Sequence, residues 1–219
     1  MTEVAPLSGP EMFPASGGKA RSMVILLHGY GSNGEDLIGL APFWRGALPD
    51  TVFLSPNAPQ PCPGAPDGYQ WWPLTDLSPA ARAAGVRRAA PVVDAFIDAQ
   101  LARFGLSEDR LALVGFSQGT MTALHVGPRR ARCLAGVIGF SGALSDPGAP
   151  AEELVTRPPI LLIHGDADPM VPVAALAQAR DTLTPLGFEV ETHVSRGLGH
   201  SIDEAGLRLG ATFLSRVLG

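Results

Sequence analysis

The stretch Leu111-Ala112-Leu113-Val114-Gly115-Phe116-Ser117-Gln118-Gly119 decides the fold of this chain. It begins as a short apolar strand, turns at a Gly-x-Ser-x-Gly motif and continues into a helix-compatible segment that ends near Val126. In such a strand–turn–helix context a serine is held on a strained turn with its hydroxyl exposed. A serine hydroxyl is a weak nucleophile until a neighbouring base removes its proton. The motif therefore predicts that a histidine, an acid and oxyanion donors lie elsewhere in the chain.

On either side of this stretch, short apolar segments alternate with longer helical patterns. Near-continuous apolar runs are typical of strands in a sheet that is covered on both faces. Their alternation with helices predicts a doubly wound, mostly parallel α/β sheet of the α/β-hydrolase type. The expected strands cover Met23–Leu27, Val52–Ser55, Leu111–Val114, Leu134–Phe140, Ile160–His164 and Glu189–Val194, and the expected helices cover Glu35–Ala47, Pro79–Phe104, Ser117–Val126, Val173–Thr184 and Ser201–Leu218.

Two segments depart from this regular alternation. Pro91 lies inside the longest helical pattern and predicts a kink or break, because proline removes a hydrogen bond and crowds the preceding turn. The segment 55–76 is a long loop rich in proline and glycine, and such loops in compact domains are usually functional or mobile. We expect Trp71 and Trp72 in this loop to bind substrate in an open groove, with core packing as the alternative for each.

The composition predicts one domain over residues 1–219, with too little chain left for a large cap domain. Hydrophobic residues make up 46% of the chain and charged residues 17%. The net charge of -5 and the pI near 5.5 argue against a nucleic-acid partner, which requires a basic surface. The densest basic cluster, Arg129, Arg130 and Arg132, is interpreted as a solvated turn.

The sequence gives no sign of a disulfide scaffold, a secretory signal or a membrane span. The two cysteines, Cys62 and Cys133, do not suggest a disulfide scaffold. The segment Met1–Pro10 lacks the basic and apolar regions of a secretory signal, and no apolar run approaches the ~18 residues of a membrane span. We therefore expect a cytoplasmic protein without a membrane span, and we consider a homodimer because the groove would have an apolar rim.

Polar residues follow the last two expected strands. Asp166 and Asp168 come directly after one strand, and His200 lies in a glycine-rich loop after the next. Because ligands of open α/β sheets bind beyond the carboxyl ends of the strands, these side chains should meet Ser117. The chain order Ser, Asp, His is that of an α/β-hydrolase triad. We expect Ser117 to be the nucleophile, His200 the base and Asp168 the acid.

The other four histidines fit structural roles better. His28 and His164 each precede a glycine at a strand end, where an imidazole can tie loops together. His125 lies about two turns beyond the serine on the same helix, and His193 falls within a strand. None of these four is expected to act as the base.

Asp166 is nearer to its strand than Asp168 and is expected to cap the turn by accepting backbone N–H groups. Two alternatives stay open for this region. Both aspartates could simply begin the next helix, or they could join His164 and His200 in a metal site. No strong metal-ligand spacing appears, and the same atoms serve a triad better, so no metal is expected.

Two backbone N–H groups are expected to stabilise an oxyanion. One belongs to Gln118 at a helix N-terminus, where the dipole favours negative charge, and the other most simply to Tyr30. The loop Gly29-Tyr30-Gly31-Ser32-Asn33-Gly34 also matches the dinucleotide-binding pattern G-x-G-x-x-G. It lacks the acid at the end of the second strand that would hold ribose hydroxyls, so no dinucleotide or other cofactor is expected.

Several segments together resemble the phospholipase/carboxylesterase family of small α/β-hydrolases, whose eukaryotic members include the acyl-protein thioesterases. The resemblance covers most of the chain, and its most specific blocks are Gly115–Gly119 and His164–Pro172. It implies the same nucleophile, acid, base and oxyanion donors as above, and no cofactor. The other matching segments are Leu26–Gly31, Pro56–Pro59, Tyr69–Pro73 and Gly199–Ser201.

These observations predict a serine hydrolase that cleaves carboxylic esters of short to medium acyl chains through an acyl-enzyme. An acyl thioesterase or lysophospholipase would use the same triad, since the triad does not encode the leaving group. A dinucleotide-dependent oxidoreductase and a catalytically silent binding module are the alternatives from other classes. Thr120 stands where the family often has a second glycine, which predicts tighter packing below the nucleophile.

Overall fold

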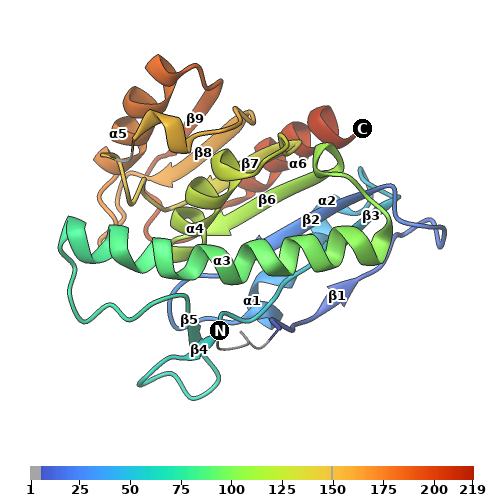
Figure 1. Ribbon diagram of the computed structural model, residues 1–219, viewed down its shortest axis with the longest axis horizontal. Helices are drawn as coiled ribbons and strands as arrows, with labels where there is room; N and C mark the ends of the chain where they lie inside the picture. The colour runs from blue at the N-terminus through green and yellow to red at the C-terminus, as the bar shows by residue number, and fades with distance from the viewer. Residues whose placement is uncertain (1–5, 149) are drawn as a thin grey trace.

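The structure is a computed structural model that describes residues 6–148 and 150–219. Over this described part, seven strands form one sheet in the order β1-β3-β2-β6-β7-β8-β9 (Figure 1). Only β1 runs antiparallel, against β3, so the predicted doubly wound, mostly parallel sheet is confirmed. The strands are β1 (Glu11–Met12), β2 (Ser22–Leu27), β3 (Thr51–Leu54), β6 (Leu111–Phe116), β7 (Gly136–Phe140), β8 (Ile160–Gly165) and β9 (Val190–Ser195).

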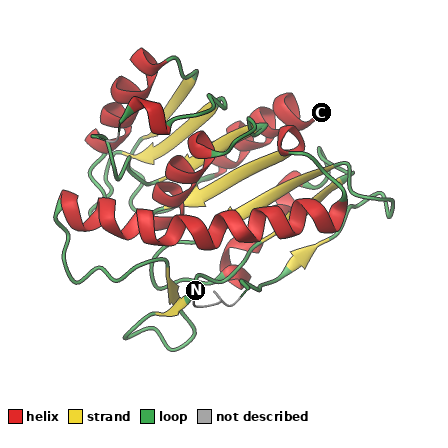
Figure 2. Ribbon diagram, viewed as in Figure 1, coloured by secondary structure: helices red, strands yellow, loops and turns green. Residues whose placement is uncertain are grey.

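Helices cover both faces of the sheet (Figure 2). Alternate residues of β2 point to opposite faces, so Ile25 lies in one core and Val24 in the other. No helix of the described residues is long and apolar enough to cross a membrane. On one face lie α3 (Pro79–Phe104), α4 (Gln118–Val126) and α5 (Ala174–Leu183), and on the other α1 (Gly34–Ile38), α2 (Ala41–Trp44) and α6 (Glu204–Leu218).

Several element boundaries differ from the expectations. The single helix expected over 35–47 divides into α1 and α2, and α2 begins at a position where the missing N–H of Pro42 has no cost. Helix α6 begins later than expected, because the side chain of Asp203 caps it by accepting the N–H of Gly206 at 2.8 Å. The long loop contains an unexpected two-stranded sheet of β4 (Gln60–Pro61) and β5 (Tyr69–Gln70).

Helix α3 is not broken at Pro91, so of the predicted kink or break, the break is wrong. The helix runs as one continuous element across the sheet (Figure 1), from a Ser78 side-chain cap to Gly105 in the left-handed conformation. Pro91 and Arg87 both lie on the exposed side of the helix. The carbonyl that proline leaves without a helical partner is therefore on the side open to water, which lowers the cost of the missing bond.

The interpretation of the basic cluster as a solvated turn is also wrong for two of its arginines. The side chain of Arg130 is only 9% exposed and pairs with Asp94 at 3.2 Å and Glu108 at 3.4 Å. Arg129 pairs with Glu153 at 2.9 Å. These pairs tie the turn after α4 to neighbouring elements, which the sequence pattern does not reveal because the carboxylates lie 22 to 36 residues away.

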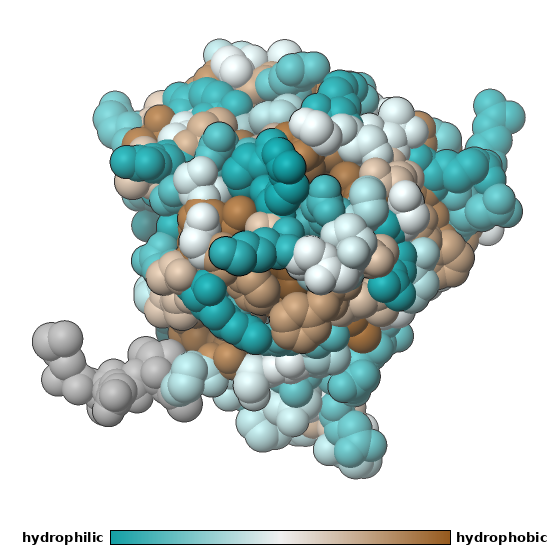
Figure 3. Space-filling view, turned by 90° about the vertical axis from the view of Figure 1, so that its right-hand side faces the viewer, coloured by the Kyte–Doolittle hydropathy of each residue, from teal (hydrophilic) through white to brown (hydrophobic). Residues whose placement is uncertain are grey.

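The edge at which β2 and β3 begin has a hollow with a mixed polar and apolar lining. Figure 3 views this side of the molecule, where polar and apolar residues are intermingled. The hollow has a volume of about 620 Å³ and is lined by Arg21, Asp50 and Arg110, among others. It lies at the opposite end of the strands from Ser117, so it does not receive the predicted site residues.

Candidate active site

Ser117 occupies a strained turn between β6 and α4. Its backbone has φ 54° and ψ -114°, a conformation that residues other than glycine rarely adopt. A Cβ on Gly115 would lie 2.3 Å from the nitrogen of Thr120, and one on Gly119 would lie 1.8 Å from the carbonyl oxygen of Leu27. Glycine is therefore required on both sides of the serine, as the elbow motif predicts.

Thr120 packs tightly below this turn, which confirms the expectation from its departure from the family pattern. Its Oγ1 lies 2.8 Å from the carbonyl oxygens of both Gly115 and Phe140. Cβ atoms on Gly139 and Gly142 would lie 2.4 and 2.3 Å from the Thr120 side chain. The threonine thus fills space that these two glycines leave open.

Asp168 and His200 are hydrogen-bonded to each other. Oδ2 of Asp168 lies 2.7 Å from Nδ1 of His200, and Oδ1 accepts the N–H groups of Met170 and Val171 at 2.8 and 2.9 Å. Burial raises the pKa of this carboxyl, but the hydrogen bonds from His200, Val171 and Met170 outweigh it, so the pKa is lowered. The ionised carboxylate accepts a hydrogen bond from the Nδ1–H of His200, so the neutral imidazole has its lone pair at Nε2.

His164 also contacts the carboxylate of Asp168. Its Nε2 lies 2.9 Å from the carbonyl oxygen of Val171 and 3.2 Å from Oδ2 of Asp168. Because both partners are acceptors, Nε2 must carry a proton. The predicted structural role of His164 is therefore correct, and the sequence did not reveal that the residue also contacts the acid.

The remaining polar residues of this region hold loops. Asp166 accepts the N–H of Gly197 at 2.6 Å, so it fixes the loop that carries His200. The prediction that Asp166 accepts a backbone N–H is correct, but this N–H belongs to the loop after β9; the turn after β8 is capped by Asp168. His28 accepts the N–H of Ala58 at Nε2 and lies 2.7 Å from the carbonyl of Gly29 at Nδ1, which defines a neutral imidazole. Burial lowers the pKa of His28 and favours this neutral form.

The segments that carry the predicted residues converge on the serine. The rings of Phe116 and His200 lie 4.9 Å apart, centroid to centroid. A Cβ on Gly29 would lie 3.3 Å from Cβ of Ser117, so the Tyr30 loop runs beside the elbow. The hydroxyl of Ser117 and the imidazole of His200 are not hydrogen-bonded to each other in this structure.

The two predicted oxyanion donors have backbone N–H groups available for a ligand. Among the described residues, neither the N–H of Tyr30 nor that of Gln118 donates to a protein acceptor. Gln118 begins α4, where the first N–H groups of a helix have no intrahelical partner. The oxyanion role of both residues stays a prediction.

Trp71 and Trp72 are not exposed in an open groove: each is 2% exposed and belongs to the core. Nε1 of Trp71 donates to the carbonyl of His28 at 2.9 Å. The side chain of Gln118 accepts the N–H of Trp71 and donates to the carbonyl of Trp72, both at 2.9 Å. The tryptophans therefore anchor the long loop to the elbow helix, and their contact with substrate stays a prediction.

Packing explains the glycines of the G-x-G-x-x-G pattern. A Cβ on Gly34 would lie 2.0 Å from the carbonyl oxygen of Ser55, and Gly31 has φ 76°. The helix that follows has only five residues and is capped by Asn33. Over residues 6–148 and 150–219, no group of three or more histidine, cysteine, aspartate or glutamate side chains is arranged to hold a metal ion.

The doubly wound sheet and the strained serine between β6 and α4 define an α/β-hydrolase. A family model described as Phospholipase/Carboxylesterase matches residues 12–218. The chain belongs to this family.

Individual relatives agree with the family. Acyl-protein thioesterase 1 of Schizosaccharomyces pombe is 30% identical over 205 residues, which cover 90% of this chain and 91% of the relative. Esterase YpfH of Escherichia coli is 27% identical over 195 residues, which cover 89% and 82% of the two chains. The crystal structure of esterase PE8 superposes with a TM-score of 0.94 at 46% identity, covering 98% of this chain and all of that one.

Proposed function

We propose that this protein is a serine hydrolase of carboxylic esters in which Ser117 is the nucleophile, His200 the general base and Asp168 its orienting acid. The observation that carries the proposal is the 2.7 Å hydrogen bond between Asp168 and His200 beside a serine in a strained elbow. Hydrogen bonding keeps the carboxylate ionised and fixes the imidazole in one tautomer, as a triad requires.

The first half of the reaction forms an acyl-enzyme. Nε2 of His200 takes the hydroxyl proton while Oγ of Ser117 attacks the ester carbonyl, and Asp168 stabilises the imidazolium that results. The carbonyl oxygen gains negative charge and accepts the N–H groups of Tyr30 and Gln118. Each such donor typically contributes ~3 kcal/mol to transition-state stabilisation. The tetrahedral intermediate then expels the alcohol, which leaves with the proton from His200.

The second half returns the enzyme to its starting state. His200 takes a proton from water, whose oxygen attacks the acyl carbonyl of Ser117. The new tetrahedral intermediate breaks its bond to Oγ, and His200 returns the proton to the serine. The products are a carboxylic acid and an alcohol, and no group beyond these residues is needed to balance the steps.

Thioester hydrolysis is the second candidate, because a relative named acyl-protein thioesterase 1 is 30% identical over most of both chains. The same residues would expel a thiolate in place of an alkoxide. The proposal favours esters of short to medium acyl chains, the class of substrate that the sequence predicts.

A chain-length series tests both candidates. We expect kcat/KM on p-nitrophenyl esters from acetate to dodecanoate to fall beyond the medium chains, and Ser117→Ala to be inactive on all of them. A rise toward the long chains, or faster cleavage of a matched acyl thioester than of the oxygen ester, would favour the thioesterase. Ester hydrolysis by Ser117→Ala at the wild-type rate would contradict the whole proposal.

A further inference from the structure

The pocket of about 390 Å³ adjoins the site but has no part in the mechanism above. One wall begins at Ala143, next to Gly142, and a Cβ on Gly142 would lie 3.0 Å from the carbonyl oxygen of Ser117. The opposite wall includes Val171, whose N–H donates to Asp168. The pocket is therefore bounded by the segments that hold the proposed nucleophile and the proposed acid.

Two polar groups that line this pocket lack partners. Nε of Arg82 and Oγ of Ser145 are buried and make no hydrogen bond to any residue that the structure describes. Ser145 as a whole is only 5% exposed. Buried polar groups in proteins are almost always hydrogen-bonded, so two of them at one pocket indicate a place for a polar ligand.

Arg82 differs from the other arginines of α3. Arg87 is bound by Asp146 and Glu153, and Arg103 by Glu11. Arg88 is exposed to solvent. Arg82 alone is half-buried in this pocket, and it forms no ion pair within the described ranges.

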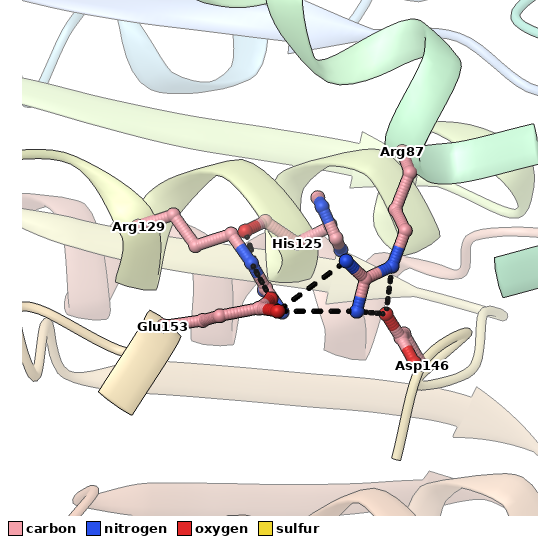
Figure 4. Close-up of polar contacts among 5 residues, drawn as sticks. All are labelled: Arg87, His125, Arg129, Asp146 and Glu153. Carbon is pink, nitrogen blue, oxygen red and sulfur yellow. Dashed lines mark hydrogen bonds and ion pairs between the residues drawn. The ribbon is translucent and has the colours of Figure 1, made fainter. Parts of the chain in front are cut away.

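The wall that carries Ser145 is held in place by ion pairs. Asp146 directly follows Ser145 and accepts a hydrogen bond from Nε of Arg87 at 2.7 Å. Arg87 also pairs with Glu153, which in turn pairs with Arg129 (Figure 4). This network fastens the loop after β7 to both α3 and the end of α4. Ser145 and Arg82, which both line the pocket, thus lie on two elements that this network holds together.

We propose that this pocket binds a carboxylate carried by the ester substrate, with Arg82 and Ser145 as its donors. The inference rests on the proposed ester hydrolysis and names the class of substrate. A guanidinium binds a carboxylate through two parallel hydrogen bonds, which are stronger when the pair is partly shielded from water. The apolar lining of Leu144, Val171 and Ala175 suits the methylene chain between the carboxylate and the reacting carbonyl.

The test compares esters that differ only in the distant charge. Mono-p-nitrophenyl adipate carries a carboxylate on the acyl side, and p-nitrophenyl hexanoate is its neutral counterpart. Acetoxyhexanoate and hexyl acetate make the same comparison on the alcohol side. We expect Arg82→Gln to lower kcat/KM for at least one anionic ester by about tenfold or more, mainly through KM, and to leave both neutral esters unchanged.

Two further variants separate a pocket from a general charge effect. Arg88→Gln removes the same charge from the exposed side of α3 and should not change any of the four rates. Ser145→Ala should lower the anionic rate in the same direction as Arg82→Gln without loss of stability, because its hydroxyl has no partner in the described chain. Ser145→Ala also tests the proposed carboxylate pocket if the Arg82→Gln variant does not fold.

The outcomes distinguish the pocket from the proposed function. If wild-type protein cleaves the neutral esters but the anionic-to-neutral ratio is the same in Arg82→Gln, Ser145→Ala and the wild type, the carboxylate pocket is wrong and the hydrolase stands. An equal effect of Arg88→Gln would likewise overturn the pocket. Failure of the wild type to cleave any of the four esters would overturn the proposed function itself.

Discussion

The hydroxyl oxygen of Thr120 lies 2.8 Å from the carbonyl oxygen of Phe140, the same oxygen that accepts the N–H of Ser117 at 2.9 Å. One carbonyl at the end of β7 therefore holds both the strained serine and the first turn of α4. A non-glycine residue with positive φ typically costs about 1–3 kcal/mol. The two hydrogen bonds to Phe140 help to offset that cost and keep the serine in position.

Replacing Thr120 by valine should destabilise the protein and lower its activity. Valine has nearly the same shape but cannot donate to Phe140, and it leaves a buried carbonyl with one partner fewer. We expect the free energy of unfolding in urea to fall by about 1–3 kcal/mol, and kcat on a p-nitrophenyl ester to fall with it. Thr120→Ser keeps the hydroxyl and should keep kcat, even if the lost methyl costs some stability. Wild-type stability and kcat in Thr120→Val would contradict this role.

Asp168→Asn should preserve the fold and lower kcat/KM by on the order of 10⁴-fold, because an asparagine no longer selects the imidazole tautomer that leaves Nε2 free. Asp166→Asn is the matched control, since among the described residues the side chain of Asp166 binds only the N–H of Gly197, in the loop that carries His200. We expect that control to lose less than about tenfold, a limit set by one hydrogen bond. A larger loss in Asp166→Asn than in Asp168→Asn would reverse the assignment of the acid.

His125 should make the protein less stable in mild acid. Burial, together with the nearby Arg129 and Arg87, lowers the pKa of His125 to about 4, although Asp146 and Glu153 act in the opposite direction. In the unfolded chain this histidine takes up its proton near pH 6.5. The unfolded state therefore binds more protons between these values, and stability falls as the pH decreases from about 6.5 toward 4.

The pH dependence can be assigned to this residue by substitution. His125→Gln should flatten the curve of unfolding free energy against pH by up to about 3 kcal/mol over that window. Some slope should remain, because burial lowers the pKa of His28 in the same direction. Identical slopes in the variant and the wild type would show that His125 does not titrate as its surroundings indicate.

Gly85→Ala should destabilise α3 although alanine is the better helix former by about 1 kcal/mol. A Cβ at this position would lie 2.4 to 2.7 Å from the ring of Trp72, which is fully packed and would have to move. We expect a net loss of about 1–3 kcal/mol in urea unfolding. Gly46→Ala, where no atom lies within 4 Å of the new Cβ, should change stability by less than about 0.5 kcal/mol. Equal effects of the two substitutions would contradict the packing argument.

Local signals in the sequence are enough to predict the sheet, the elbow and the pairing of Asp168 with His200. These signals are apolar runs of strand length, two glycines that flank a serine, and polar residues placed directly after strands. A parallel sheet brings the carboxyl ends of its strands to one edge, so residues at those ends can be grouped from their order in the chain. The sequence also shows that a proline lies inside the helical pattern of α3. It does not show that Pro91 lies on the exposed side of the helix, where the missing hydrogen bond does not break the helix.

Contacts between side chains far apart in the chain follow only from the packed fold. The pairing of Gln118 with the backbone of Trp71, 47 residues away, accompanies the burial of the tryptophans that the sequence pattern assigned to a groove. Arg129 and Arg130 pair with carboxylates on other elements, and Arg82 and Ser145 line one pocket. No periodicity encodes such contacts, because they depend on how separate elements pack and on which polar groups burial leaves without water.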